Sequence, residues 1–288
     1  MNYDGIKESK DSYYVCPVCK QLLTATTKAL FCQREGVEYP VKNGIPDFIA
    51  EDLTKSTNLL LRSTDIIDNI AKIYEGPYYG TVQMINAELG IPPMEEVEKM
   101  VMKEVDAKNG VGLDVACGTG FFTRPLAQKM RRVYGIDVSM GMLEKATEYA
   151  QEKGVKNICF ARSRVERLPF PDGLFDGVIC SRGLHKFPDT VEALNEMARV
   201  MKRGAQLAVL TVVKQGLSTL KTIFERMGAS NPLAKEALEA FNVEELDKYL
   251  SQTGIVIEEL DKYLSQTGFN GFAYTLYGYF MLFHAEKK

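Results

Sequence analysis

The residues with the clearest chemical meaning lie in a short run of small residues, Ala116–Gly120, directly after an apolar segment. Gly118 and Gly120 can adopt backbone conformations closed to other residues, so backbone N–H groups in such a turn approach a ligand closely. Asp137 ends the next apolar segment, and its distance from Asp114 fits the spacing of about 20 residues at which an acid binds a ribose diol. Together these features predict a site for a nucleoside cofactor.

An alternation of strands and helices must position these residues. Strands are predicted at 111–115, 133–137, 157–161, 175–181, 206–213, 270–277 and 279–286. Helices are predicted at 94–108, 121–130, 140–153 and 190–202. Such alternation predicts an α/β fold with a doubly wound, mostly parallel sheet. Right-handed crossovers then bring the C-terminal ends of the parallel strands to one edge, where the ligand binds.

Several motifs resemble, in order and spacing, those of the class I S-adenosylmethionine (SAM)-dependent methyltransferases. They cover roughly residues 110–213. The motifs are the D-x-x-C-G-T-G run from Asp114, Ile136–Leu143, Arg167–Asp176, Leu184–Asp189 and Glu196–Gly204. The third glycine of a dinucleotide-binding turn is missing, because Thr123 stands at its position. The resemblance implies a Rossmann-like sheet of seven strands, with SAM as the cofactor and S-adenosylhomocysteine (SAH) as its product.

The resemblance also implies which residues bind the cofactor. They are Asp114, Ala116, Cys117, Gly118, Gly120, Asp137, Val138, Met142, Arg164, Val165 and Ser181. Asp137 would take the ribose hydroxyls, and Met142 would flank the adenine ring. Arg164 departs from the family, which usually has an aspartate there for the adenine amino group, and an arginine has no acceptor. We therefore expect altered adenine contacts and somewhat weaker SAM binding.

His185 follows the fourth predicted strand, at the edge where substrate and methyl group should meet. A histidine suits the role of general base near neutral pH, so His185 is the candidate catalytic residue. A packing residue or a hydrogen-bond donor is the alternative. Alignment supplies much of the rate of a methyl transfer, and a base is needed only where the nucleophile must lose a proton.

Residues 1–50 are predicted to form a separate β-rich module. Cys16 and Cys19 form a C-x-x-C pair, Cys32 follows after a hairpin-like stretch, and a Y-P-V-x-N-G-I-P run begins at Tyr39. These features resemble the small zinc ribbon that precedes the catalytic domain in some methyltransferases.

Zinc in a structural site normally takes four ligands, and the cysteines supply three. Glu35 stands where the resemblance places the fourth. Two interpretations stay open. Cys16, Cys19 and Cys32 hold zinc together with Glu35 or a ligand from elsewhere, or the ribbon binds no metal and folds on its apolar residues.

The module precedes a mostly helical segment at 51–108 and a methyltransferase domain at 109–288. The helical segment is either a lid over the active site, as in similar methyltransferases, or a linker with packing helices. Residues 214–241 are predicted to be a helical insertion that closes over substrate or packs on the core.

A tandem duplication lies at 244–268. Glu244–Gly254 recurs letter for letter as Glu258–Gly268. Solenoid repeats come in longer series, so this pair does not indicate a repeat protein. The second copy leads into the final strands, and the first copy is predicted to be surplus.

Composition narrows the classes of function. The chain has 288 residues and a net charge of −3, with acids and bases interspersed, which argues against a nucleic-acid substrate. No apolar stretch approaches the roughly 18 residues that cross a bilayer. The polar N-terminus is unlike a signal peptide, and 6 cysteines without secretory context indicate a reducing compartment. We expect a cytoplasmic protein.

The function predicted from the sequence is methyl transfer from SAM to a small, apolar or aromatic molecule by in-line displacement. The motifs are most similar to the branch that includes the quinone-biosynthesis methyltransferases. One alternative is a ribosomal-RNA base methyltransferase, since a zinc ribbon precedes this domain in such an enzyme. The other is a non-catalytic protein that binds SAM or a partner.

Overall fold

The computed structural model describes residues 13–26, 28–49, 90–105, 108–213, 256–277 and 280–288, with Ala71, Glu75, Gln83 and Ala87. Most of the helical segment at 51–89 therefore lies outside the described residues. The same holds for the insertion at 214–241 and for the first copy of the duplication at 244–254.

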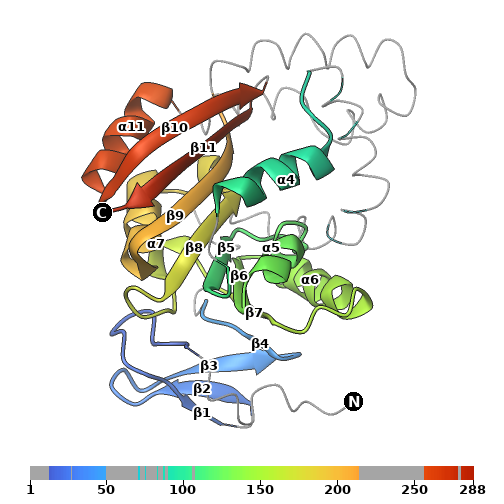
Figure 1. The fold of residues 1–288 in the computed structure, drawn as a ribbon. Helices are drawn as coiled ribbons and strands as arrows, with labels where there is room; N and C mark the ends of the chain where they lie inside the picture. Colours follow the sequence, from blue (N-terminus) through green and yellow to red (C-terminus); the bar gives the residue numbers. More distant parts are fainter. Residues whose placement is uncertain are drawn as a thin grey trace, which may run out of the picture.

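A seven-stranded sheet forms the centre of the molecule, in the order β10-β11-β9-β8-β5-β6-β7 (Figure 1). The strands are β5 (Val111–Val115), β6 (Arg132–Asp137), β7 (Ile158–Arg162), β8 (Phe175–Ser181), β9 (Met201–Val212), β10 (Phe269–Tyr277) and β11 (Phe280–Lys287). Strands β5 to β9 pair in parallel, whereas β11 runs antiparallel to both β9 and β10. The predicted seven-stranded, mostly parallel sheet is confirmed.

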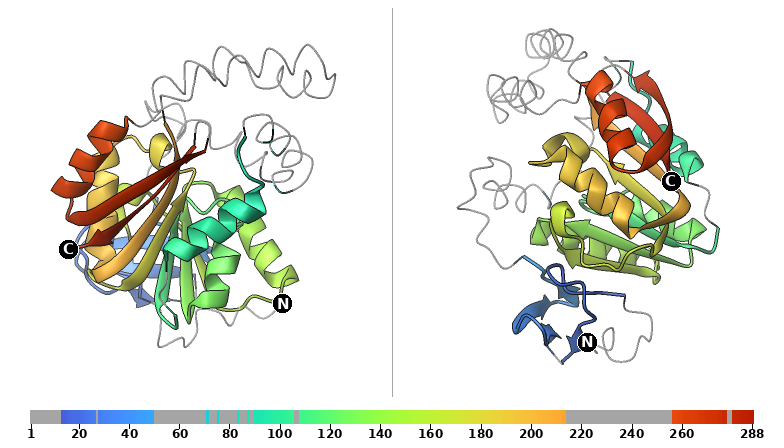
Figure 2. Two further views of the ribbon diagram at one scale, coloured as in Figure 1. Left: turned by 45° about the horizontal axis from the view of Figure 1, so that its top comes forward. Right: turned by 90° about the vertical axis from the view of Figure 1, so that its left-hand side faces the viewer.

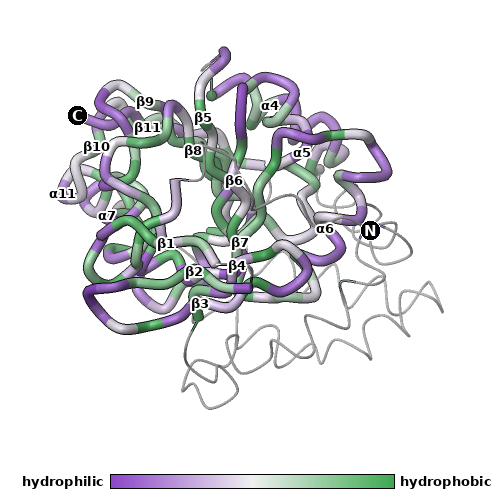
Figure 3. The backbone as a smooth tube through the Cα atoms, turned by 90° about the horizontal axis from the view of Figure 1, so that it is seen from below, coloured by the Kyte–Doolittle hydropathy of each residue, from purple (hydrophilic) through white to green (hydrophobic). Residues whose placement is uncertain are grey.

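Helices cover both faces of this sheet (Figures 1 and 2). On one face lie α4 (Met94–Glu104), α5 (Thr123–Lys129) and α6 (Met140–Glu152), and on the other lie α7 (Thr190–Val200) and α11 (Ile257–Gln266). Strand β5 is buried along its whole length, as expected between two helical layers. Figure 3 shows hydrophobic residues concentrated along the central strands. Among the described residues, no helix has the length and apolar character to cross a membrane.

Several element boundaries differ from the predicted ones, among them the end of α4, which is Glu104 rather than residue 108 because Val105 is extended. Helix α5 begins at Thr123, because the residues after Gly120 first complete a turn. Strand β9 begins at Met201, which pairs with Phe175 before an irregularity in the ladder. The second copy of the duplicated segment forms most of α11 and leads into β10, as predicted.

The N-terminal module is a four-stranded antiparallel sheet at the β7 edge of the large sheet (Figure 1). Its strands are β1 (Thr24–Ala25), β2 (Ala29–Cys32), β3 (Val37–Lys42) and β4 (Ile45–Pro46). Asp47 forms a parallel bridge with Arg162 of β7, and the Phe48 N–H donates to the Arg162 carbonyl at 2.8 Å. The residues that follow β4 therefore attach the module to the end of the edge strand β7.

The module also shares its hydrophobic core with the large sheet. The Tyr14 ring packs against Phe48, Tyr134 and Phe170, with centroid separations of 5.4, 5.5 and 5.5 Å. The connection from β7 to β8 contains only the short 3₁₀ helix η2 (Val165–Arg167), so it supplies no long helix for this face. The module takes the place of such a helix over β6.

Candidate functional site

The turn after β5 forms the cradle of the site. Ala116, Gly118 and Gly120 have φ of 56°, 53° and 77°, in the left-handed region that favours glycine. The Cys117 N–H donates to the Ile136 carbonyl at 2.9 Å, which anchors the turn to β6. A Cβ on Gly118 would meet nothing within 4 Å, so there is open space beside this residue. The turn can therefore admit a ligand close to its backbone.

Asp137 lies at the end of β6, directly beside this turn. Its Oδ2 accepts from the Gly118 N–H and its Oδ1 from the Ser139 N–H, both at 2.9 Å. Burial raises the pKa of Asp137, while these backbone hydrogen bonds and the charge of Lys186 oppose the rise. Each carboxylate oxygen keeps a second lone pair, so the two hydroxyls of a ribose can still donate to Asp137.

Asp114 is buried in β5, with 1% of its surface exposed. Its Oδ2 accepts from the Thr123 hydroxyl at 2.6 Å, whereas its buried Oδ1 has no partner among the described residues. Burial raises the pKa of Asp114 to about 7, helped by the charge of Asp137 and opposed by the Thr123 hydrogen bond. A buried acceptor without a partner costs about 1–3 kcal/mol, so a donor group on a ligand would be favoured here.

A pocket lies between the glycine turn and the end of β8. Its lining residues are Asp114, Ala116, Cys117, Gly118, Thr119, Phe121, Phe122, Ser181 and Arg182. The Ser181 hydroxyl is a second buried polar atom without a partner among the described residues. The pocket therefore combines unsatisfied polar atoms with the aromatic residues Phe121 and Phe122.

Glu75, from the segment ahead of α4, also contacts the glycine turn. Its Oε1 accepts from the Thr119 hydroxyl at 2.5 Å, and its Oε2 accepts from Arg124 at 2.6 Å. Arg124 further donates to the Thr119 carbonyl at 2.8 Å. The sequence did not predict either residue, because Glu75 lies 44 positions from Thr119 and the nearby Arg124 has no feature that distinguishes it from a solvated charge.

The residues predicted to contact adenine lie just after β6 and β7, with Met142 in the first turn of α6 and Val165 in η2. Met142 and Val165 are buried, and the Met142 N–H donates to Ser139, which caps α6. The Val138 carbonyl accepts from Arg162 at 2.8 Å. Arg164 forms an ion pair with Glu166 at 3.4 Å. Its effect on adenine binding stays a prediction.

His185 is buried in the short helix η3 (Leu184–Lys186), outside the lining of the described pocket. Its Nδ1 lies 3.3 Å from the hydroxyl of the buried Thr211. Burial lowers the pKa of His185 well below its ordinary value, and the charges of Lys186 and Arg182 act in the same direction. The imidazole is therefore neutral at physiological pH, and its role as a general base stays a prediction.

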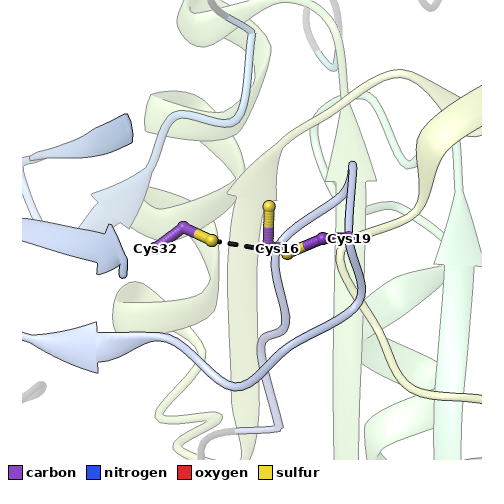
Figure 4. A group of neighbouring side chains, drawn as sticks. All are labelled: Cys16, Cys19 and Cys32. Atoms are coloured by element: carbon purple, nitrogen blue, oxygen red, sulfur yellow. Dashed lines mark hydrogen bonds between the residues drawn. The ribbon is translucent and has the colours of Figure 1, made fainter. Parts of the chain in front are cut away.

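The three cysteines of the N-terminal module come together, as Figure 4 shows. The Sγ atoms of Cys16, Cys19 and Cys32 all lie within 4.8 Å of one another, and the last two are 3.5 Å apart. Burial acts to raise the pKa of the Cys16 thiol, but hydrogen bonds from the Cys19 backbone and the Tyr39 hydroxyl outweigh it and lower the pKa. Three converging sulfur atoms fit a soft cation such as zinc.

The order and direction of the strands define a class of protein. Strand β11 alone runs opposite to the other six strands and lies between β9 and β10, with a glycine turn after β5 and an acid at the end of β6. This combination defines a class I methyltransferase fold, and known proteins similar to this chain belong to the same class.

Residues 113–209 match the family described as "Methyltransferase domain". An uncharacterized methyltransferase of Bacillus subtilis is 32% identical over 137 residues, which make up 47% of this chain and 54% of that relative. A demethylmenaquinone methyltransferase of Listeria welshimeri is 30% identical over 163 residues, or 54% of this chain and 68% of that relative. The crystal structure of a SAM-dependent methyltransferase from Aquifex aeolicus has a TM-score of 0.51 and 22% identity, and the match covers 70% of this chain and 97% of that chain.

The chain belongs to the SAM-dependent methyltransferase family, because it matches the Listeria relative over 68% of that protein's length. It spans about half the length of the relatives from Bacillus subtilis and Anoxybacillus flavithermus, at 54% and 55%. The family is therefore assigned, and the reaction of this chain follows as a proposal.

Proposed function

We propose that the chain catalyses methyl transfer from SAM to a small, apolar or aromatic molecule. The observation that carries this proposal is the convergence of three features on one site. They are the glycine turn, the carboxylate of Asp137 and the Asp114 Oδ1, which has no partner among the described residues. Each suits a different part of the cofactor.

The residues of the site fit the cofactor group by group. Asp137 would accept from the ribose hydroxyls, since both of its oxygens retain a lone pair. The Asp114 Oδ1 would accept from the ammonium of the methionine part, which supplies its missing partner. The buried side chains of Met142 and Val165 would flank adenine. When bound, SAM supplies a methyl group attached to a cationic sulfur, and the sulfur is the leaving group of the in-line displacement.

The acceptor would meet the methyl group at the end of β8. Phe121 and Phe122 give the pocket apolar walls, which favour an apolar or aromatic acceptor over a highly charged one. The name of the Listeria relative, a demethylmenaquinone methyltransferase, supports a quinone-like acceptor. Alignment and exclusion of water can supply most of the rate, so a neutral His185 is compatible with the reaction.

Two experiments test the proposal in sequence. Isothermal titration with SAM and SAH should give micromolar affinity, about −8 kcal/mol, and Asp137→Ala should abolish it. The matched control is Asp261→Asn, at an exposed carboxylate of α11. Absence of binding by the wild-type chain would refute the proposal.

Methyl transfer is then measured with SAM carrying a labelled methyl group. A short-chain demethylmenaquinol and purified ribosomal RNA are offered separately as acceptors. Label in the quinol alone supports the proposed acceptor class. Label in the RNA alone, with binding that weakens steeply with salt, would assign the reaction to RNA instead.

A further inference from the structure

The N-terminal module contains two turns of matching geometry, each beginning at a cysteine. In the first cysteine turn (Cys16–Lys20), the Lys20 N–H donates to the Cys16 carbonyl at 2.9 Å. In the second cysteine turn (Cys32–Gly36), the Gly36 N–H donates to the Cys32 carbonyl at 2.9 Å. Both turns end in the left-handed region, with φ of 60° at Lys20 and 66° at Gly36. The two turns are therefore structural equivalents.

This equivalence places Glu35 at the position of a fourth ligand for the three cysteines. Glu35 holds in the second turn the position that Cys19 holds in the first. Its backbone N–H donates to the Cys32 Sγ at 3.5 Å, and its side chain is exposed. The Glu35 carboxylate lies outside the group of three sulfur atoms, so rotation of this exposed side chain must bring it in. Zinc binds three thiolates and one carboxylate in a tetrahedral site, with release of the thiol protons.

The first cysteine turn is also attached to the catalytic domain. The Val15 N–H donates to the Pro169 carbonyl at 2.9 Å. The Lys20 ammonium donates to the Leu168 carbonyl and to Glu196 Oε2, both at 3.2 Å. The same oxygen of Glu196 accepts from the Leu168 N–H at 2.8 Å. Val15 and Lys20 flank Cys16 and Cys19 in the sequence. Their hydrogen bonds therefore attach the first cysteine turn to residues 168–169.

Residues 168–169 end the loop that begins at Ser163, on the adenine side of the cofactor site. The Ser163 N–H donates to the Asp137 carbonyl at 3.0 Å, which joins this loop to the predicted ribose ligand. A second attachment runs from Asp47 to Arg162 at 3.2 Å, and Arg162 donates to the Val138 carbonyl at 2.8 Å. The module therefore contacts the loop after β7 directly and is joined to the loop after β6 through Arg162.

We propose that Cys16, Cys19, Cys32 and Glu35 hold one zinc ion, and that this ion raises cofactor affinity by fixing the turn that carries Val15 and Lys20. The inference rests on the proposed SAM binding. The ion takes no part in the methyl transfer. It stabilises the conformation of the loop at 163–169. Removal of the ion therefore lowers cofactor affinity although the ion does not contact the cofactor.

The first measurement is the zinc content of the purified full-length chain. We expect one zinc ion per chain, and a loss of zinc affinity of at least about tenfold in Glu35→Gln and in Cys19→Ser. Absence of zinc after incubation with Zn²⁺ overturns the inference. Retention of full affinity in Glu35→Gln overturns the assignment of the fourth ligand.

The second measurement is SAH affinity by titration calorimetry, with and without zinc. Removal of zinc by a chelator should raise the Kd for SAH about tenfold, and added Zn²⁺ should restore it. Lys20→Met should keep its zinc and still raise the Kd about fivefold, because it removes only the contacts to Leu168 and Glu196. The matched control is Lys28→Met, at an exposed lysine of the same module.

The lysine variants keep the inference testable even if the zinc-free chain unfolds, which circular dichroism would reveal. An unchanged SAH affinity in Lys20→Met, with zinc retained, overturns the coupling. A Lys28→Met variant as weak as Lys20→Met also overturns it, since a general loss of charge would then explain both. Absence of SAH binding by the zinc-loaded wild-type chain instead overturns the proposed function, and the coupling with it.

Discussion

The Thr119 hydroxyl donates a hydrogen bond to Glu75 at 2.5 Å, which ties a residue ahead of α4 to the glycine turn. Arg124 completes a closed group of three by donating to Glu75 at 2.6 Å and to the Thr119 carbonyl at 2.8 Å. Thr119 stands between two glycines in the left-handed conformation, Gly118 and Gly120. The shape of the glycine turn is thus stabilised by the side chains of Glu75 and Arg124 from outside the turn.

Replacement of Glu75 by glutamine should raise the Kd for SAH about tenfold, because the charge opposite Arg124 is lost while the shape is kept. The pair is largely buried, with 12% of Arg124 and 18% of Glu75 exposed, so solvent screens it only in part. Titration calorimetry measures the effect. Glu152→Gln, at an exposed position near the end of α6, is the control. A Kd within twofold of the wild type would show that the turn keeps its shape without Glu75.

The raised pKa of Asp114 makes cofactor binding depend on pH. In the proposed complex the ammonium of SAH would pair with the carboxylate, so Asp114 would lose its proton on binding, and a pKa of about 7 places this loss at neutral pH. Affinity therefore rises with pH, and we expect the Kd to be about tenfold larger at pH 6 than at pH 8.

Titration calorimetry in two buffers of different ionisation enthalpy would detect the released proton. Asp114→Asn keeps an acceptor for Thr123 and removes the titration, so its weaker affinity should be independent of pH. Asp137 also has a raised pKa, and persistence of the pH dependence in Asp114→Asn would assign it to Asp137 instead.

The glycine turn and the acid of the site could be predicted because their signals are local. The apolar run of β5 ends directly in the turn residues, and Asp137 ends the next strand at the expected spacing. The structure brings the two signals together, since the Gly118 N–H donates to Asp137 Oδ2 at 2.9 Å, and the ribose role of Asp137 stays a prediction. The strand order follows from the same alternation, since right-handed crossovers allow few arrangements.

The contacts that support the site could not be predicted, because they join distant parts of the chain. Glu75 and Thr119 are 44 positions apart, and Lys20 and Glu196 are 176 apart. No periodicity relates such pairs, and the charged side chains of Glu75, Lys20 and Glu196 each look, alone, like solvated surface charges. The packing of Tyr14 in the main core could not be predicted for the same reason, since its partner Tyr134 lies far along the chain.

The shared core predicts opposite effects for two substitutions at Tyr14. Its hydroxyl is buried without a partner among the described residues, so Tyr14→Phe should keep or raise the free energy of unfolding, by up to about 1 kcal/mol. Tyr14→Ala should lower it by about 3–5 kcal/mol, because it leaves a cavity between Phe48, Tyr134 and Phe170.

Urea denaturation measures both effects. The control is Tyr274→Ala on β10, where 47% of the residue is exposed and the expected change is within about 0.5 kcal/mol. A Tyr14→Ala variant as stable as this control would mean that the module and the catalytic domain do not share a core.

The lowered pKa of His185 predicts how its imidazole responds to acid. Burial keeps the ring neutral in the folded chain, so its NMR signals should not titrate between pH 8 and 5.5. The chain has 2 histidines, and His284→Gln assigns the remaining signal to His185. A titration near pH 6.5 would contradict the buried, neutral state and would favour the general-base role.

The same shift has a consequence for stability, with a definite sign. The unfolded chain takes up a proton at His185 below about pH 6.5 and the folded chain does not, so stability falls as the pH is lowered, by up to about 1.4 kcal/mol per unit. Asp114, whose folded pKa is raised, contributes the opposite slope between about pH 4 and 7. Urea denaturation of the wild type and of His185→Gln is compared across this pH range. Asp114 contributes equally to the free energy of unfolding of both proteins, so the difference between them reports His185 alone. The variant should lose relatively less stability on acidification, and parallel pH profiles for the two proteins would refute the assignment.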